Sequence, residues 1–298
     1  MTTGRFAPSP SGDLHLGNLR TALLAWCFAR HSGGRFLIRV EDLTTGAEPR
    51  RTTEMLEDLA AVGIDHDPPI VFQSERRIRY DEVVDRLTEA GLTYPCYCSR
   101  RDIREAASAP HGPPIEGGYP GTCRDLSDSE LAERRSHGRP PALRMRAGNA
   151  TVAVSDRLLG PIGGPVDDFV VRRADGVAAY NLAVVVDDAD QGIDQVVRGD
   201  DLVETTARQV LLQHVLDLAT PEYVHVPLVL GPDGERLAKR HGAVTLREQI
   251  AAGRTSAQVV GALAASCGLG SPDEALDAAT VLSRFDPDAL EISSRVPD

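Results

Sequence analysis

The sequence is nearly devoid of lysine: its 32 basic residues are all arginines except Lys239. Taken alone, one lysine in a polar loop after a Pro/Gly turn is explained by biased composition and a solvated charge. The chain also has no apolar run of the roughly 18 residues that a membrane span requires. Its start, MTTGRFAPSPSGDLHLGN, lacks the basic and then apolar layout of a signal peptide. We therefore expect a cytoplasmic protein with no membrane partner.

Positive charge is scarce overall, since the formal net charge is −12 over 298 residues. This balance disfavours an unspecific binder of polyanions, because contacts to phosphates need a cationic surface. It does not exclude a nucleic-acid partner, since charge acts locally. The arginines gather in short runs such as EPRRTT and CSRRDIR, which are more often solvated helix faces than binding surfaces.

Cysteine is limited to five residues, an odd number that does not suit a disulfide framework. Cys27 and Cys267 lie in apolar helical surroundings and are interpreted as buried small side chains. The other three fall close together in a segment rich in proline and glycine: Cys96, Cys98 and Cys123. A Cys-x-Cys pair with a third cysteine after a loop suits a structural, tetrahedral Zn²⁺. From chemistry alone, the fourth ligand would be His111.

The periodicity of the first segment predicts an α/β protein. A strand over 4–8, a helix over 14–34 and a strand over 35–42 imply a right-handed crossover and a parallel sheet. From Tyr94 to about Ala179 short β-like stretches replace this alternation, as in an inserted module. Parallel-sheet character returns with YNLAVVVDDADQGIDQVVRGDD, in which Asp187 and Asp188 are interpreted as an acidic turn and not as Mg²⁺ ligands. The remainder is helical and rich in alanine.

The two common phosphate-binding motifs are missing. Without GxxxxGK[ST] the chain is not a P-loop NTPase, and without GxGxxG after the first strand dinucleotide binding has no support. The first strand-to-helix turn instead reads PSPSGDLHLGN, in which Ser9, Ser11 and Gly12 precede His15, Gly17 and Asn18. Because a helix start presents free N–H groups and partial positive charge, this turn suits a phosphate ligand.

Four segments are informative by their order and spacing: RFAPSPSGDLHLGNLRTALLAW, FLIRVED, VVRGDD and RLAKRHGA. Together they resemble the class I glutamyl-tRNA synthetases, whose HIGH and KLSKR elements correspond to HLGN at 15–18 and RLAKR at 236–240. The resemblance runs from about Arg5 to the early helical tail. Arg236 replaces the first lysine of the family loop and Ala238 replaces its serine, whereas Lys239 is kept.

The resemblance implies a class I synthetase fold with a Rossmann-like parallel sheet. Its catalytic domain would be formed by 1–95 and 180–235, with an inserted, zinc-bearing module of the acceptor-binding type over 96–179. The lysine loop and a short helical tail would occupy 236–298, with no anticodon-binding domain. No long heptad pattern is present, so we expect a monomer.

The resemblance also assigns roles to residues. ATP, entering with Mg²⁺, would be bound by Ser11, His15, Gly17, Asn18, Lys239 and Arg240, of which His15, Asn18 and Lys239 would be catalytic. L-glutamate would be bound by Arg5, Ser9, Glu41, Tyr180 and Arg198. Arginine forks suit the two carboxylates of this substrate, and an acid suits its amine. Singly, Glu41 could instead cap the next helix and Arg198 could pair with Asp200 on the surface.

The missing anticodon-binding domain and one further feature, a cysteine pattern, resemble one branch of the family. In this branch the Cys-x-Cys pair is followed by Tyr-x₃-Cys, which Tyr119 and Cys123 match, so Tyr119 is preferred to His111 as the fourth zinc ligand. These short paralogues activate glutamate without tRNA and transfer it to the queuosine base at the wobble position of tRNA(Asp). The alternatives are a short glutamyl-tRNA synthetase that charges a tRNA 3′ end and an inactive tRNA-binding paralogue, against which His15, Asn18 and Lys239 argue.

Replacement of Lys239 by alanine is expected to depress glutamate-dependent exchange between ATP and pyrophosphate strongly, on the order of a hundredfold. A compact ammonium on a flexible stem can follow the moving phosphate charge. Exchange is measured with purified protein in the absence of tRNA, and circular dichroism checks that the fold is intact. An unchanged rate would remove the loop from the mechanism.

Overall fold

A computed structural model describes residues 1–43, 46–107, 118–148, 150–237, 241–242 and 244–297. Its centre is a seven-stranded sheet in the order β3-β2-β1-β9-β10-β6-β7. The strands are β3 (Asp67–Phe72), β2 (Arg35–Val40), β1 (Thr3–Phe6), β9 (Gln195–Gly199), β10 (Glu222–Val226), β6 (Thr151–Asp156) and β7 (Gly160–Pro165). All neighbouring strands are parallel except the β6–β7 hairpin. The predicted α/β fold with a parallel sheet is therefore confirmed.

The large sheet separates two hydrophobic cores. Along β2, Phe36 and Ile38 belong to one core and Leu37 to the other. This alternation follows from the two-residue period of a strand, whose successive side chains point to opposite faces. Polar side chains at the carboxyl ends of such strands are held in place by packing on both faces.

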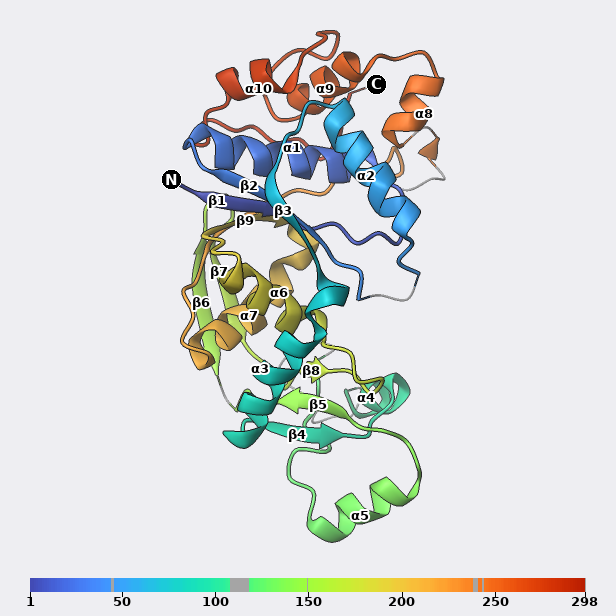
Figure 1. The fold of residues 1–298 in the computed structure, drawn as a ribbon, viewed down its shortest axis with the longest axis vertical. Coiled ribbons are helices and arrows are strands. Elements are labelled where there is room, and N and C mark those ends of the chain that lie inside the picture. Colours follow the sequence, from blue (N-terminus) through green and yellow to red (C-terminus); the bar gives the residue numbers. More distant parts are fainter. Residues whose placement is uncertain (44–45, 108–117, 149, 238–240, 243, 298) are drawn as a thin grey trace.

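The first core surrounds α1 (Leu16–His31), which is buried along most of its length. The sheet covers one side of this helix, and α9 (Ser256–Ala265) and α10 (Ala278–Arg284) pack on it as well (Figure 1). α2 (Pro49–Ala61) lies beside it, and α8 (Leu246–Ala251) precedes α9. Cys27 and Cys267 are both buried in this core, as expected from their apolar surroundings.

The second core lies beneath α6 (Tyr180–Asp190), α7 (Val203–Val215) and α3 (Arg77–Glu89). Two short 3₁₀ turns, η1 (Gln73–Arg76) and η2 (Asp200–Leu202), lead into α3 and α7. Residues 180–190 therefore form a helix, and the interpretation of Asp187 and Asp188 as an acidic turn is wrong. The run YNLAVVVDD is buried almost all round, so its pattern does not distinguish a helix from a strand.

A second, three-stranded sheet lies at the end of the molecule opposite the helical tail (Figure 1). It contains β4 (Thr93–Cys96), β5 (Ala142–Met145) and β8 (Val170–Arg172), accompanied by α4 (Arg100–Ala107) and α5 (Asp128–Ser136). The hairpin β6–β7, which the sequence placed in the inserted module, instead extends the large sheet, where Asp156 is paired with Tyr223. Alternating apolar residues predict a strand, but they do not indicate the strand with which it pairs, because that strand lies far along the chain. The domain division itself stays a prediction.

No helix among the described ranges is both long and apolar enough to cross a membrane.

Candidate active site

A cleft of about 450 Å³ opens where β1, β2 and β9 end. In a parallel sheet, ligands collect at this edge because the loops that follow the strands leave a crevice there. The cleft is lined by all the described residues that the sequence predicted for ATP and glutamate: Arg5, Ser9, Ser11, His15, Gly17, Asn18, Glu41, Tyr180 and Arg198. The remaining two predictions, Lys239 and Arg240, lie outside the described residues, as does Ala238.

His15 and Asn18 hold each other at the start of α1. The Asn18 amide donates to His15 Nδ1 at 3.2 Å, and the His15 amide donates to the Asn18 side-chain oxygen at 3.2 Å. Because Nδ1 accepts, a neutral His15 carries its proton on Nε2. Burial, and next the cation of Arg236, lower the pKa of His15 against the opposing effect of Asp201. The neutral imidazole is thus favoured at pH 7.

Gly17 is required by the position of this imidazole. A Cβ at residue 17 would lie 3.0 Å from the His15 ring and 3.4 Å from the Cβ of Val229. The glycine therefore leaves room for the ring close to the first turn of the helix.

The two described flanks of the lysine loop are fastened beside the cleft. Before the loop, the Leu237 amide donates to the Val229 carbonyl at 2.9 Å. After the loop, the Val244 carbonyl accepts from the Leu16 amide at 2.7 Å. Residues that precede and follow 238–240 are thus tied to the loop after β10 and to the start of α1.

Arg236, which stands where the family has its first lysine, lines the cleft and pairs with Asp201 at 3.1 Å. Neither side chain was singled out as a site residue from the sequence. At the end of the cleft near α1, an anionic ligand would therefore meet the guanidinium of Arg236, which is paired with Asp201, and the imidazole of His15.

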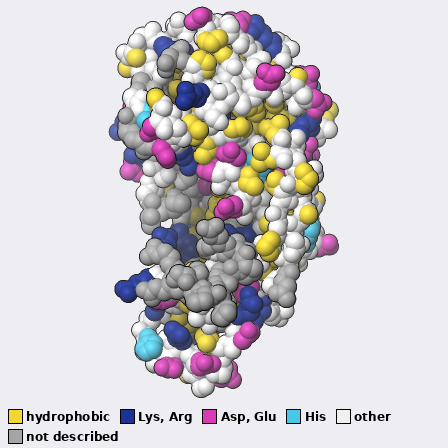
Figure 2. Space-filling model, turned by 180° about the vertical axis from the view of Figure 1, so that it is seen from behind, with side chains coloured by type: hydrophobic (Ala, Val, Ile, Leu, Met, Phe, Trp, Pro, Cys, Tyr) yellow, Lys and Arg dark blue, Asp and Glu magenta, His cyan; other side chains and the backbone are white. Residues whose placement is uncertain are grey.

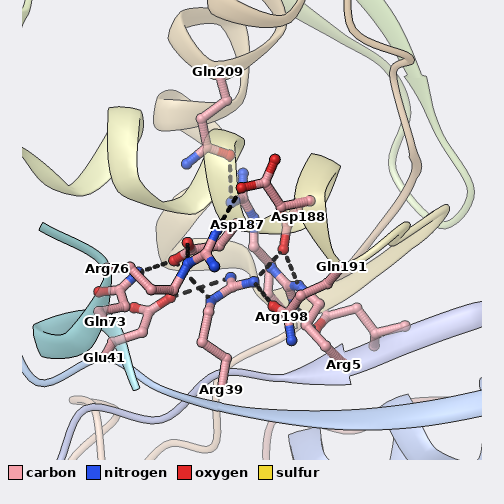
Figure 3. A network of polar contacts seen from close by, with 12 residues as sticks. Arg5, Arg39, Glu41, Gln73, Arg76, Asp187, Asp188, Gln191, Arg198 and Gln209 are labelled. Atoms are coloured by element: carbon pink, nitrogen blue, oxygen red, sulfur yellow. Dashed lines mark hydrogen bonds and ion pairs between the residues drawn. The ribbon is translucent and has the colours of Figure 1, made fainter. Parts of the chain in front are cut away.

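A buried ion-pair network supports the opposite end of the cleft (Figure 3). Arg39 has no solvent exposure and donates to Asp188 at 2.6 Å and to Glu41 at 3.4 Å. Asp188 also accepts from Arg5 at 3.2 Å. Burial alone would raise the pKa of Asp188, but Arg39 and Arg5 outweigh it and hold that pKa below its usual range. One carboxylate from α6 thus fixes arginines from β1 and β2.

Asp187 anchors the same helix through further donors. It accepts from Gln73 at 2.8 Å and from Arg76 at 2.6 Å (Figure 3). It also accepts from the Tyr80 hydroxyl at 2.9 Å. The sequence prediction missed Arg39 and both aspartates as parts of the site. The available signal was a charged residue within the otherwise apolar strand RFLIRV, which burial makes costly unless it is paired.

Arg198, at the end of β9, is held by three buried side chains. It donates to Gln209 at 2.7 Å, to Thr206 at 2.8 Å and to His225 at 3.0 Å. The alternative of a surface pair with Asp200 is wrong, because Arg198 is only 4% exposed. Tyr180, by contrast, is 39% exposed and lies at the rim.

The three cysteines among the four predicted zinc ligands lie together at the end of β4. The sulfur atoms of Cys96, Cys98 and Cys123 all lie within 4.8 Å of one another, and they are the only such metal-ligating group in the described part of the chain. Tyr119 lies beside them, with its hydroxyl oxygen 3.4 Å from the sulfur of Cys96 and 3.7 Å from that of Cys98. The alternative ligand, His111, lies outside the described residues.

The fold and the cleft define the catalytic domain of a class I aminoacyl-tRNA synthetase. The family model described as "tRNA synthetases class I (E and Q), catalytic domain" matches residues 1–263. A solved glutamate tRNA ligase from Elizabethkingia meningosepticum has the same fold, with a TM-score of 0.81 and 24% identity. That match covers 97% of this chain and 66% of the solved chain.

The chain belongs to the glutamyl-Q tRNA(Asp) synthetase family, whose members are ligases. It is 62% identical over 266 residues to the glutamyl-Q tRNA(Asp) synthetase of Nocardia farcinica, covering 89% of this chain and 85% of that relative. The corresponding protein of Symbiobacterium thermophilum is 47% identical over 299 residues, covering 96% and 93%.

Replacing Asp188 by asparagine is expected to lower the free energy of unfolding by about 3–5 kcal/mol at pH 7, because two buried arginines lose their shared counter-ion. Since the folded-state pKa of Asp188 is depressed, its contribution is present above about pH 4 and is lost as pH falls below that value. The stability of Asp188→Asn should therefore depend less on pH in that acid range. Urea unfolding over a pH series measures both effects.

Asp190→Asn, two residues along the same helix, is the control. Its carboxylate pairs with Arg76 and Arg79 at a more exposed position, so a loss of about 1 kcal/mol or less is expected. Equal losses in the two variants would contradict the special position of Asp188.

Proposed function

We propose that the chain activates L-glutamate with ATP, without tRNA, and transfers the glutamyl group to the queuosine base at the wobble position of tRNA(Asp). The observation that carries this proposal is the single cleft that unites a HIGH-type helix start with Arg5, Glu41 and Arg198. The choice of acceptor is supported by the family to which the chain belongs, whose members are named glutamyl-Q tRNA(Asp) synthetases.

The charges of the cleft match glutamate. Arg5 and Arg198 offer two guanidinium groups for its two carboxylates, and Glu41 offers a carboxylate for its ammonium. Burial raises the pKa of Glu41, against the opposing effect of Arg39 and Arg5. A bound ammonium would stabilise the ionised form of this desolvated carboxylate. Ser9 and Tyr180 complete the proposed pocket.

The end of the cleft near α1 is proposed to hold ATP, which enters as its Mg²⁺ complex. Ser11, Gly17 and the helix start would receive phosphate oxygens, and the neutral His15 would donate from Nε2. The α-carboxylate of glutamate then attacks the α-phosphorus in line, and pyrophosphate leaves as glutamyl-adenylate forms. Positioning and charge stabilisation by Asn18, Lys239 and Arg240 would lower the barrier without a covalent enzyme intermediate.

Transfer requires a nucleophilic hydroxyl of the modified base to attack the carbonyl carbon of the adenylate, with AMP as the leaving group. Local charge supports an RNA partner: residues 93–147 contain nine arginines and seven acidic residues, in a chain of net charge −12. On the face seen in Figure 2, basic side chains lie at several places around the end that holds the three-stranded sheet.

A structural Zn²⁺ is proposed for Cys96, Cys98, Cys123 and Tyr119. The donor set fits, because the sulfurs of Cys98 and Cys123 are 3.5 Å apart, close to the edge of about 3.8 Å that tetrahedral Zn–S bonds of about 2.3 Å generate. The hydrophobic cluster here is small, built on Tyr94 with three of these ligands. When bound, the metal would stabilise this module and take no part in the chemistry.

The acceptor test compares three RNAs: tRNA(Asp) with queuosine, tRNA(Asp) without it, and tRNA(Glu). We expect glutamate-dependent ATP–pyrophosphate exchange without any tRNA, and transfer of labelled glutamate only to queuosine-containing tRNA(Asp). Charging of a 3′ end would instead support a short glutamyl-tRNA synthetase. Absence of exchange would support a non-catalytic tRNA-binding protein.

Loss of zinc is expected for Cys98→Ser, with a lower melting temperature of the protein, because the metal cross-links the small sheet. Elemental analysis after dialysis and thermal unfolding measure the two effects. Cys27→Ala is the control that keeps the metal, since Cys27 is buried in the first core, around α1, and not in the cluster of the zinc ligands. If Tyr119→Phe weakens zinc binding and His111→Ala leaves it unchanged, Tyr119 is the fourth ligand. Zinc retained by Cys98→Ser would contradict the site.

A further inference from the structure

Arg198 is oriented by a chain of buried side chains that continues beyond the cleft into the β6–β7 hairpin. Its partner His225, the penultimate residue of β10, has no solvent exposure. On the other side of the imidazole, Nδ1 lies 2.7 Å from the Oδ2 of Asp156, at the end of β6. The order is therefore Asp156, His225, Arg198, and then the cleft.

The contact with Arg198 fixes the tautomer of His225. Arg198 approaches His225 Nε2 with its Nε–H at 3.0 Å, and an arginine side chain has no acceptor atom. Nε2 must therefore present its lone pair, and the ring proton lies on Nδ1, facing Asp156. An imidazolium, or the other tautomer, would place two N–H groups against each other.

The hydrogen bonds of Asp156 maintain this tautomer of His225. Its Oδ2 accepts from both the backbone amide and the ring of His225, at 3.0 and 2.7 Å. Its Oδ1 accepts from the amides of Leu158 and Leu159 at 3.0 and 2.9 Å. Burial would raise the pKa of Asp156, but these hydrogen bonds outweigh it and lower that pKa. The carboxylate stays ionised and acts only as an acceptor.

The guanidinium has little freedom left. Besides His225, it donates to Gln209 and Thr206, which are buried side chains of α7. The Arg198 plane is thus fixed from β10 and from α7 while the group lines the cleft. Loss of one contact would let the plane rotate about the bonds that remain.

We propose that His225, held as its Nδ1–H tautomer by Asp156, is the positioning residue that aims Arg198 at a carboxylate of the amino-acid substrate. This inference rests on the proposed function and deepens it, because it makes glutamate affinity depend on a residue that does not touch glutamate. It also gives the β6–β7 hairpin a task in substrate selection.

The kinetic test measures kcat and both KM values in glutamate-dependent ATP–pyrophosphate exchange. His225→Leu removes the acceptor and is expected to raise KM for glutamate about 10- to 100-fold, the usual effect of losing a hydrogen bond to a charged group. KM for ATP should change less than about threefold, since that end of the cleft is separate. His225→Gln supplies an amide oxygen near the place of Nε2 and should recover most of the loss.

His214→Gln is the matched control, because His214 is an exposed histidine in the last turn of α7. It should keep wild-type values for both substrates. A merely structural role of His225 predicts a different result: both KM values, kcat and the melting temperature would change together, and equally in the leucine and glutamine variants. That result would overturn the proposal.

A spectroscopic test needs no activity. Ring ¹H–¹⁵N correlation spectra of the protein labelled at histidine nitrogens report which nitrogen carries the proton, and the signals missing from His225→Gln identify His225. The wild type should show Nδ1–H, and Asp156→Asn should increase the Nε2–H population and raise KM for glutamate. A wild-type ring protonated on Nε2, or on both nitrogens, would overturn the proposal.

The two tests separate this inference from the function on which it rests. A wild-type protein that exchanges no pyrophosphate in the presence of glutamate contradicts the proposed function. The ring spectra still decide the tautomer in that case. If His225→Leu fails to fold, the kinetics of His225→Gln and Asp156→Asn and the wild-type spectrum decide the proposal.

Discussion

The buried pairing of Asp188 with Arg5 and Arg39 is the interaction on which the substrate cleft depends. A guanidinium without solvent is strongly unfavourable unless carboxylates surround it, so the helix that carries Asp188 must lie against the ends of β1 and β2. That requirement places α6 and, with it, Tyr180 at the rim. The charge that is proposed to bind substrate and the charge that holds the fold thus belong to one network.

The same arrangement recurs at two other arginines that line the cleft. Arg198 lies among His225, Thr206 and Gln209, and Arg236 pairs with Asp201. In each case the arginine that lines the cleft is fixed by hydrogen bonds or an ion pair to polar side chains of another element. Preorganised charge of this kind lowers the cost of binding an ionic ligand, because little reorganisation remains to be done.

Prediction from the sequence placed residues of local motifs at one site, and the structure brings those residues together at one cleft. HLGN is a helix start whose N-cap chemistry acts within four residues, and Glu41 and Arg198 follow the apolar stretches of β2 and β9. It failed where a partner lies far along the chain. Asp188 is 149 residues from Arg39, and β6 pairs with β10 across a long connection. Nothing in a local pattern states which distant charge or strand will be adjacent.

Periodicity and spacing along the chain indicate the parallel α/β architecture, the helix start HLGN and the grouping of three cysteines, because such patterns act over a few residues. The folded chain alone shows that Asp187 and Asp188 are buried counter-ions, that the β6–β7 hairpin joins the large sheet, and that Asp156 reaches Arg198 through His225. The physical reason is that desolvated charges must be paired in space, and the packing of whole elements brings the partners together.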